Sequence, residues 1–299
     1  MEVDCGRRLC GPPAKKVMPG HVFDKNFAEN DAERWLLALG AMYKGAEKES
    51  VQLASVPELY LQISRDAPGA SKGLFGKLFG GSMRAAAASA LKKFWDVGDE
   101  ASTLSTVGWL LREGHATVYN HLLGLLIQTG AIGKGGERLI DNSDSLQKLL
   151  ESLSEKAAPI VEHPKKLLFV YENAERLAPS GILAWDLARA VKVLEQAVKA
   201  SYLLNSEIVW GHLKLIGMLA HHAFGSWQAY ANSYLAGLSF WDILSKDRTY
   251  NEICRRLLAH PQSPWNVFLW DTPLPTEAWT EELRSNPVLQ AYVASHLSS

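Results

Sequence analysis

The chain has 299 residues, of which 47% are hydrophobic and 21% are charged. This composition is typical of a folded globular protein and differs from that of a disordered one. The 31 basic residues nearly balance the 32 acidic ones, so we expect no nucleic-acid partner, which would need a surface with clustered lysine and arginine. No run of about 18 apolar residues occurs, so we expect no membrane-spanning helix.

Residues 1–29 are rich in glycine and proline and predict a flexible arm. Cys5 and Cys10 lie in this arm, but no second cysteine pair or histidine cluster accompanies them, so we expect neither zinc nor another cofactor. Cys254 is the one further cysteine, and so few cysteines indicate a reducing compartment. No apolar stretch follows the basic residues, as a secretory signal would require. We therefore expect a cytoplasmic protein, although a machine that exports folded proteins would need no such signal.

Helix-start signals mark the first half of the chain. Asn30, Ser55 and Asp99 are typical N-cap residues ahead of apolar periodicity. The alanine-rich run 83–95 also favours a helix, since alanine has the highest intrinsic propensity. Residues 115–128 predict another helix, and we expect it to be central because it is apolar on nearly all sides.

Two glycine-rich stretches, 68–82 and 130–145, interrupt this helical pattern. Neither has the spacing of a phosphate-binding loop. We expect 68–82 to be a flexible loop whose apolar side chains pack on the core; the alternative is that Leu74–Gly81 contacts a membrane. The stretch 130–145 is a candidate boundary between two subdomains.

The second half of the chain is also helical. Helices are predicted near 145–156, over 164–177, three times within 181–241, over 247–259 and after Pro287. Between the last two lies a proline- and tryptophan-rich stretch, which we expect to be irregular and to expose Trp265, Trp270 and Trp279.

No segment shows the alternation of a β-strand, so we predict an all-α fold, an irregular multi-helix globular bundle. We expect one helical domain over residues 30–245. Residues 246–299 should pack on this domain.

Residues 182–203 form the most informative predicted helix. At 100° per residue, apolar residues form a stripe toward the core, and Lys192, Glu195 and Lys199 mark the solvent side. Asp186 and Arg189 lie on neither side, so we expect them to be partly buried and, at i,i+3 spacing, paired. They could form a structural ion pair, which we favour, or a functional pair in which Asp186 transfers protons and Arg189 binds an anion.

The next two helices carry histidines and aromatic residues. His212 and His222 are ten residues apart, about 15 Å along a helix, so they cannot share one ion and we expect no metal site. An aromatic stripe from Trp227 to Trp241 repeats at helical spacing. Such a stripe is typical of a core, and a ligand pocket lined by the same side chains is the alternative.

Several short motifs between residues 30 and 245 are distinctive in combination. They are Glu33-Arg34-Trp35, Trp95, Leu110-Leu111, Glu113-Gly114-His115, Trp185-Asp186-Leu187-Ala188-Arg189, Tyr202-Leu203, Glu207, Trp210, Ser226-Trp227, Tyr234-Leu235, Gly237 and Trp241. Together they resemble the bacterial family called domain of unknown function 1266. The chain departs from the family pattern at Leu204-Asn205-Ser206 and at His221-His222. The resemblance implies a cytoplasmic helical domain without an established activity, and it singles out His115, Asp186 and Arg189 as the polar residues of the pattern.

Two hypotheses about function follow. The lack of a recognisable catalytic motif and the expected exposure of the late tryptophans favour a non-enzymatic interaction or adaptor module. Its partner would be another protein, in a chaperone or secretion system. The alternative is an enzyme or toxin-like effector of hydrolase type, in which His115 and Asp186 transfer protons and Arg189 holds an anion. The alternative requires that these three side chains share a cleft open to solvent.

Overall fold

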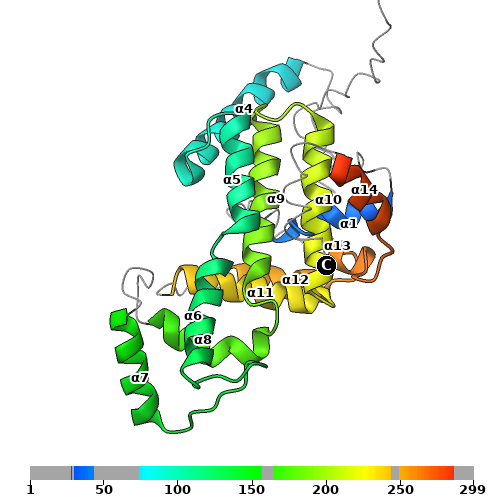
Figure 1. Ribbon diagram of the computed structural model, residues 1–299. Helices are drawn as coiled ribbons and strands as arrows, with labels where there is room; N and C mark the ends of the chain where they lie inside the picture. Colours follow the sequence, from blue (N-terminus) through cyan, green and yellow to red (C-terminus); the bar gives the residue numbers. More distant parts are fainter. Residues whose placement is uncertain (1–27, 29, 44–73, 157–164, 244–248, 286–299) are drawn as a thin grey trace, which may run out of the picture.

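The computed structural model describes residues 28, 30–43, 74–156, 165–243 and 249–285. Within these ranges the regular secondary structure is helical, and the only strand-like pairing is one isolated antiparallel bridge between Ile132 and Arg138 (Figure 1), which confirms the predicted all-α fold. The helices are α1 (Asp31–Ala38), α4 (Leu74–Trp95), α5 (Glu100–Arg112), α6 (Ala116–Gln128), α7 (Ser143–Lys156), α8 (Lys165–Leu177), α9 (Leu183–Lys199), α10 (Ser206–Ala223), α11 (Trp227–Trp241), α12 (Thr249–Ala259), α13 (Pro264–Val267) and α14 (Thr276–Ser285).

Helix α9 is the centre of the fold. Figure 1 shows it side by side with α5 and α10, and it also packs against α4 and α11. Of its 17 residues, 13 are buried, so these neighbours cover more of the helix than the one face that its apolar stripe predicts. For this reason Glu195, which we predicted on the solvent side, is buried and forms an ion pair with Lys199 at 2.8 Å.

The apolar core consists of two clusters of buried side chains. The larger one surrounds α9 and takes in residues of α1, α4, α5, α10, α11, α12, α13 and α14. The smaller one is built by α6, α7 and α8, and Ala236 and Phe240 of α11 complete it. Helix α11 therefore contributes to both clusters and ties them together. The division of the chain into domains stays a prediction.

Helix α6 does not have the central position that we predicted for residues 115–128. It packs mainly on α8, in the smaller cluster, and its buried residues are Ala116, Tyr119, Leu122 and Leu126. Leu123, Leu125 and Ile127 are only partly buried. An apolar surface on nearly all sides is therefore consistent here with a helix that packs at the end of the bundle.

Side-chain caps begin the helices where the sequence predicts them. Asn30 accepts a hydrogen bond from the backbone N–H of Glu33 at 2.9 Å, and Asp99 forms a capping box with Ser102. Ser226 caps α11 by accepting from the backbone N–H of Ala229 at 3.1 Å. Each cap satisfies an amide that the first turn of a helix leaves without a partner.

Replacing Ser226 with alanine is expected to lower the free energy of unfolding by about 1 kcal/mol, the usual cost of removing an N-cap. Ser239 of the same helix is the matched control, because its hydroxyl bonds back to the carbonyl of Leu235 within the helix and the residue is exposed. Ser239→Ala should change stability little or raise it slightly. Urea denaturation of the two variants measures the difference, and equal stabilities would contradict the capping role.

Two predictions about helix boundaries are wrong. Residues 74–82, which we predicted as part of a loop, form the first turns of α4. Propagation of a helix costs far less than its nucleation, so the alanine-rich run extends the helix back through these glycines. Helix α14 lies ahead of Pro287, where we expected none; Trp279 and Leu283 are its buried residues, at i,i+4 spacing.

The tryptophans that we predicted to be exposed, Trp265, Trp270 and Trp279, are buried. The indole N–H of Trp265 donates to the carbonyl of Ala38 at 2.9 Å, and that of Trp270 donates to the carbonyl of Phe224 at 2.9 Å. The ring of Trp265 also stacks on that of Trp227, with centroids 5.2 Å apart. The segment is irregular apart from the short helix α13, which carries Trp265, and Trp279 lies on α14.

In the part of the chain that the structure describes, no helix has the length and apolar character needed to cross a membrane. The predicted arm with Cys5 and Cys10, the helix expected from the Ser55 signal and the helix after Pro287 lie outside the described residues.

Candidate functional site

Asp186 and Arg189 form the buried ion pair that their spacing on α9 predicts. The side chain of Asp186 is 1% exposed and that of Arg189 is 7% exposed. One η nitrogen of the guanidinium contacts Oδ1 of the carboxylate. Because both charges are removed from water, each depends on the other and on further hydrogen bonds to remain inside the protein.

The carboxylate of Asp186 also caps a different helix. The backbone N–H of His115 donates to Oδ1 at 3.1 Å, and that of Ala116 donates to Oδ2 at 2.7 Å. These amides lie at the start of α6, and the side chain of His115, its own N-cap residue, makes no capping hydrogen bond. A negative charge at this end of a helix is favoured by the helix dipole as well as by the amides.

Gly114 makes this approach of α6 to α9 sterically feasible. It has a φ of +49°, a left-handed conformation that glycine adopts without strain. A Cβ built on it would lie within 3.0 Å of the carboxylate of Asp186. The turn between α5 and α6 therefore needs glycine both for its backbone conformation and for the space that Asp186 occupies.

The guanidinium of Arg189 joins the pair to His115 and to two indoles. Its Nη2 lies 2.7 Å from Nδ1 of His115, and its Nε donates to the carbonyl of Trp185 at 3.2 Å. The guanidinium carbon lies 4.9 Å from the ring centroid of Trp185 and 5.7 Å from that of Trp95. Cation–π attraction to these rings adds to the ion pair in holding the charge.

The contact with Arg189 fixes the tautomer of His115. A guanidinium has no acceptor, so Nδ1 must accept the hydrogen bond and the ring proton of the neutral imidazole is on Nε2. The side chain of His115 is 15% exposed. Trp241 and Trp109 both contact the imidazole edge to face, with centroids 4.4 Å and 5.7 Å away. His115 thus lies between two indoles, and its Nε2–H makes no hydrogen bond with a described residue.

The structure brings together the three residues that we singled out, but Asp186 and Arg189 do not share a cleft open to solvent. Asp186 accepts two backbone amides and Arg189, and Nδ1 of His115 is occupied by Arg189. A general base requires an acceptor atom that is accessible and unused, and neither Asp186 nor His115 has one. The geometry therefore fits a structural role for Asp186 and Arg189. A catalytic role for the three residues stays a prediction.

Sequence reasoning missed two members of this site. Trp109 lies six residues before His115, and no motif in that interval indicates their contact. We placed Trp241 in the buried aromatic stripe of α11, but its position at the last residue of that helix leaves it 50% exposed. In contrast, Trp227, Tyr230 and Tyr234 of the stripe are buried, as core spacing predicts.

The other polar candidates have roles within the fold. Nδ1 of His212 lies 2.8 Å from the carbonyl of Ile208, and burial lowers the pKa of this histidine. The ring of His221 packs against Trp35 and Trp270. Burial raises the pKa of the Cys254 thiol to about 12, which leaves it without thiolate character near neutral pH. Among the described residues, no group of three or more potential ligands could hold a metal ion.

Residues 90–270 match the model of a family described as a protein of unknown function, DUF1266. This region is more than half of the 299 residues. The chain belongs to the DUF1266 family. Comparison with curated proteins and with solved structures gives no match.

Five of the residues named in the sequence motifs of this DUF1266 protein lie close together in the fold. Trp95, His115, Asp186, Arg189 and Trp241 are widely separated in the sequence but meet in one network of contacts.

Proposed function

We propose that this protein is a non-enzymatic, cytoplasmic adaptor that binds another protein through the aromatic surface around His115. We call this surface the His115 cluster and define it as Trp95, Trp109, His115 and Trp241. The observation that carries the proposal is the half-exposed indole of Trp241, held edge to face against His115 at 4.4 Å. Large aromatic side chains of this kind supply much of the binding energy in protein interfaces.

The His115 cluster offers a partner two kinds of contact. The exposed part of the Trp241 indole can bury an apolar side chain. Beside it, Nε2–H of His115 makes no hydrogen bond with a described residue and can donate to an acceptor. A backbone carbonyl next to an apolar side chain provides both contacts, so the partner we propose is a protein segment with that arrangement.

The buried network beneath the cluster supports this proposal, because it fixes the cluster before a partner binds. Arg189 and Asp186 hold His115 by its backbone amide and its Nδ1, so the imidazole has little freedom to rotate. A surface that is already ordered loses less conformational entropy on binding. In this proposal the cluster takes the role that we first gave to Trp265, Trp270 and Trp279, which are buried.

Site-specific photocrosslinking tests the proposed surface. In cells that express the full chain, a Trp241→p-benzoylphenylalanine variant is expected to form a defined crosslinked complex with one protein. Leu139 is the matched control, because it is also a large apolar residue that is exposed but lies outside the His115 cluster. A Leu139→p-benzoylphenylalanine variant should not give this complex. Equal crosslinking from both positions, or none from position 241, would rule out the surface.

With the crosslinked partner purified, Trp241→Ala is expected to weaken its binding about tenfold or more, as for a tryptophan at the centre of an interface. Leu139→Ala should bind with the affinity of the unmodified protein. Isothermal titration calorimetry measures both affinities. Unchanged affinity of the Trp241→Ala variant would refute the proposed function even if a crosslink had formed.

An enzyme of hydrolase type is the second candidate, and the observation that favours it is the convergence of His115, Asp186 and Arg189. In this arrangement His115 would act through Nε2–H, as a hydrogen-bond donor to negative charge that develops on a substrate. Hydrolysis of nitrophenyl acetate or nitrophenyl phosphate that is lost in His115→Ala would support this candidate. Hydrolysis that survives in the variant, or its absence in both proteins, would count against it.

A further inference from the structure

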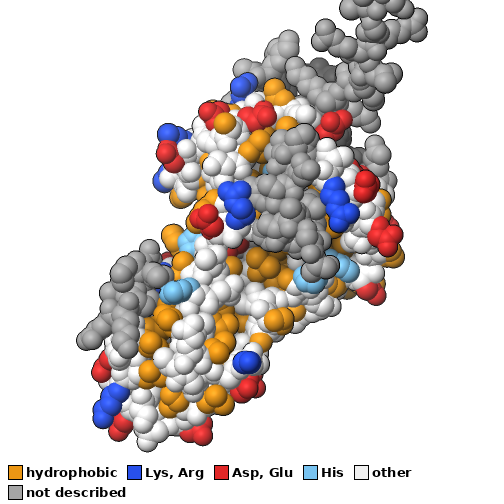
Figure 2. All heavy atoms as spheres, in the orientation of Figure 1, with side chains coloured by type: hydrophobic (Ala, Val, Ile, Leu, Met, Phe, Trp, Pro, Cys, Tyr) orange, Lys and Arg blue, Asp and Glu red, His pale blue; other side chains and the backbone are white. Residues whose placement is uncertain are grey.

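The outward face of α6 has an unusual composition for a helix at the end of a bundle. The helix packs mainly on α8, and no aspartate, glutamate, lysine or arginine occurs among its 13 residues. Figure 2 shows hydrophobic side chains on both sides of α6, in the lower part of the view. The residues that are exposed or only partly buried around its outer side, which we call the α6 face, are Thr117, Asn120, His121, Gly124, Leu125, Ile127 and Gln128.

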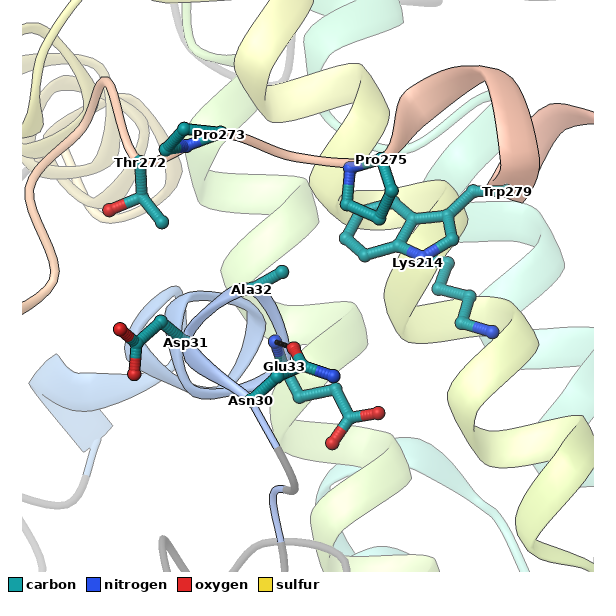
Figure 3. A pocket seen from close by; sticks show the side chains of 9 residues that line it. All are labelled: Asn30, Asp31, Ala32, Glu33, Lys214, Thr272, Pro273, Pro275 and Trp279. Atoms are coloured by element: carbon teal, nitrogen blue, oxygen red, sulfur yellow. Dashed lines mark hydrogen bonds between the residues drawn. The ribbon is translucent and has the colours of Figure 1, made fainter.

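Other helices of the protein carry charged side chains where they meet solvent, as is usual. Helix α7, which belongs to the same apolar cluster as α6, exposes charged residues of both signs, namely Asp144, Lys148 and Glu151. Lys214 of α10 lines the pocket shown in Figure 3 and pairs with Glu282 of α14, with Nζ 2.6 Å from Oε1. The α6 face differs from both, and a lack of charged residues is typical of the buried centre of a protein interface.

Gly124 lies at the centre of the α6 face. At 100° per residue, it is opposite the buried side chains of Tyr119, Leu122 and Leu126. Glycine inside a helix is less stable than alanine. The fold itself does not require it here, because a Cβ at this position would meet no atom within 4 Å, whereas a Cβ on Gly237 of α11 would collide with a neighbouring helix. A glycine that points outward in this way leaves room for another backbone to approach closely.

The charge pattern of the α6 face favours a second copy of the chain as its partner. A surface without acidic or basic residues offers no electrostatic attraction to a charged protein. In a dimer with two-fold symmetry, residues near the axis meet their own counterparts, so charged residues there would repel each other. The amides of Asn120 and Gln128 avoid this repulsion, since an amide can donate to and accept from a copy of itself. Leu125 and Ile127, on either side of Gly124, would supply the apolar contact.

From these features we infer that the protein forms a symmetric dimer in which the α6 helices of two copies cross at Gly124. The α6 face shares no residue with the His115 cluster, so this inference does not rest on the proposed function. From Thr117 to Gln128 the face is about 16 Å long. A contact of this length buries less surface than a permanent dimer does, so we expect a monomer–dimer equilibrium that depends on concentration. Each dimer would carry two His115 clusters.

Sedimentation velocity of the full chain, at concentrations from about 1 to 200 μM, tests the inference. The average mass should rise from that of a monomer toward that of a dimer. Gly124→Glu should weaken the association about tenfold or more, because it places two carboxylates and two added side chains where the helices cross. Its own fold should be retained, since the added Cβ has no obstacle and glutamate has the higher helix propensity. Thermal unfolding at low concentration verifies this.

Ser152→Glu is the matched control for the added charge. Ser152 is an exposed, neutral residue inside α7, the other helix of this cluster with an exposed side. The variant should associate like the unmodified protein.

A cysteine in place of Gly124 tests how closely the two helices approach. Two cysteines that face each other form a disulfide only when their Cα atoms lie within about 7 Å. With Cys5 and Cys10 replaced by serine and the buried Cys254 left in place, oxidation by copper–phenanthroline should link Gly124→Cys into dimers. Gly98→Cys is the matched control, because Gly98 is also exposed and unobstructed but lies outside α6. A monomer at every concentration, unchanged association of Gly124→Glu, or equal crosslinking of both cysteine variants would overturn the inference.

Discussion

Replacing Asp186 with alanine is expected to lower the free energy of unfolding by about 3–5 kcal/mol, the usual cost of removing one partner of a buried ion pair. In this variant the guanidinium of Arg189 stays buried without its counter-charge. The amides of His115 and Ala116, at the start of α6, lose their acceptor as well. Urea denaturation followed by far-ultraviolet circular dichroism measures the change.

A double variant, Asp186→Ala with Arg189→Met, separates the unpaired charge from the lost cap. It removes both charges, and methionine retains much of the apolar volume of the arginine stem, so it should be more stable than Asp186→Ala alone. A cost below about 1 kcal/mol for Asp186→Ala would show that Asp186 does not anchor α6, whereas no recovery in the double variant would assign the cost to the lost cap and not to the unpaired charge. The first of these outcomes would support the catalytic hypothesis.

The ion pair shows how far the sequence can predict this site. The i,i+3 spacing of Asp186 and Arg189, and their place between the apolar and charged stripes, predict a buried pair on α9. Spacing on one helix carries no information about which other helix approaches it. The capping of α6 by Asp186 is a contact across 70 residues, and only the positive φ of Gly114 leaves a trace of it in the sequence, as a glycine.

For Trp265, Trp270 and Trp279, sequence reasoning failed for a different reason. The frequent prolines between Pro261 and Pro275 predict an irregular backbone, which the structure shows apart from the four-residue helix α13, and we equated irregularity with exposure. The indoles of Trp265 and Trp270 instead reach carbonyls at Ala38 and Phe224, 227 and 46 residues away. Composition indicates that a segment lacks a long helix, but the burial of its side chains depends on partners that lie elsewhere in the chain.

The position of the proposed binding surface depends on how closely α9 and α11 approach each other, because His115 contacts a residue on each of these helices. Arg189 on α9 holds His115, and Trp241 at the end of α11 lies against the same imidazole. Both helices must therefore keep their separation if His115 and Trp241 are to remain in contact. Gly237, one turn before Trp241 on α11, lies directly against the side chain of Trp185 on α9.

Replacing Gly237 with alanine is expected to lower the free energy of unfolding by about 2–3 kcal/mol, at the upper end of the usual cost of overpacking. A Cβ at this position would lie within 3.0 Å of Cβ and Cγ of Trp185. Since Cβ of Trp185 is fixed to the backbone of α9, no change of rotamer can relieve the contact, and the helices must move apart. Urea denaturation measures the loss, and partner binding should weaken as Trp241 shifts.

Gly124→Ala in α6 is the matched control, because this glycine is also inside a helix but has no atom within 4 Å of a built Cβ. Alanine there should raise the free energy of unfolding by about 0.5–1 kcal/mol, since it has the higher helix propensity and finds no obstacle. The two substitutions are chemically identical, but they should change the free energy of unfolding in opposite directions. If Gly237→Ala were also stabilising, close packing of α9 on α11 would not be what requires glycine in this motif.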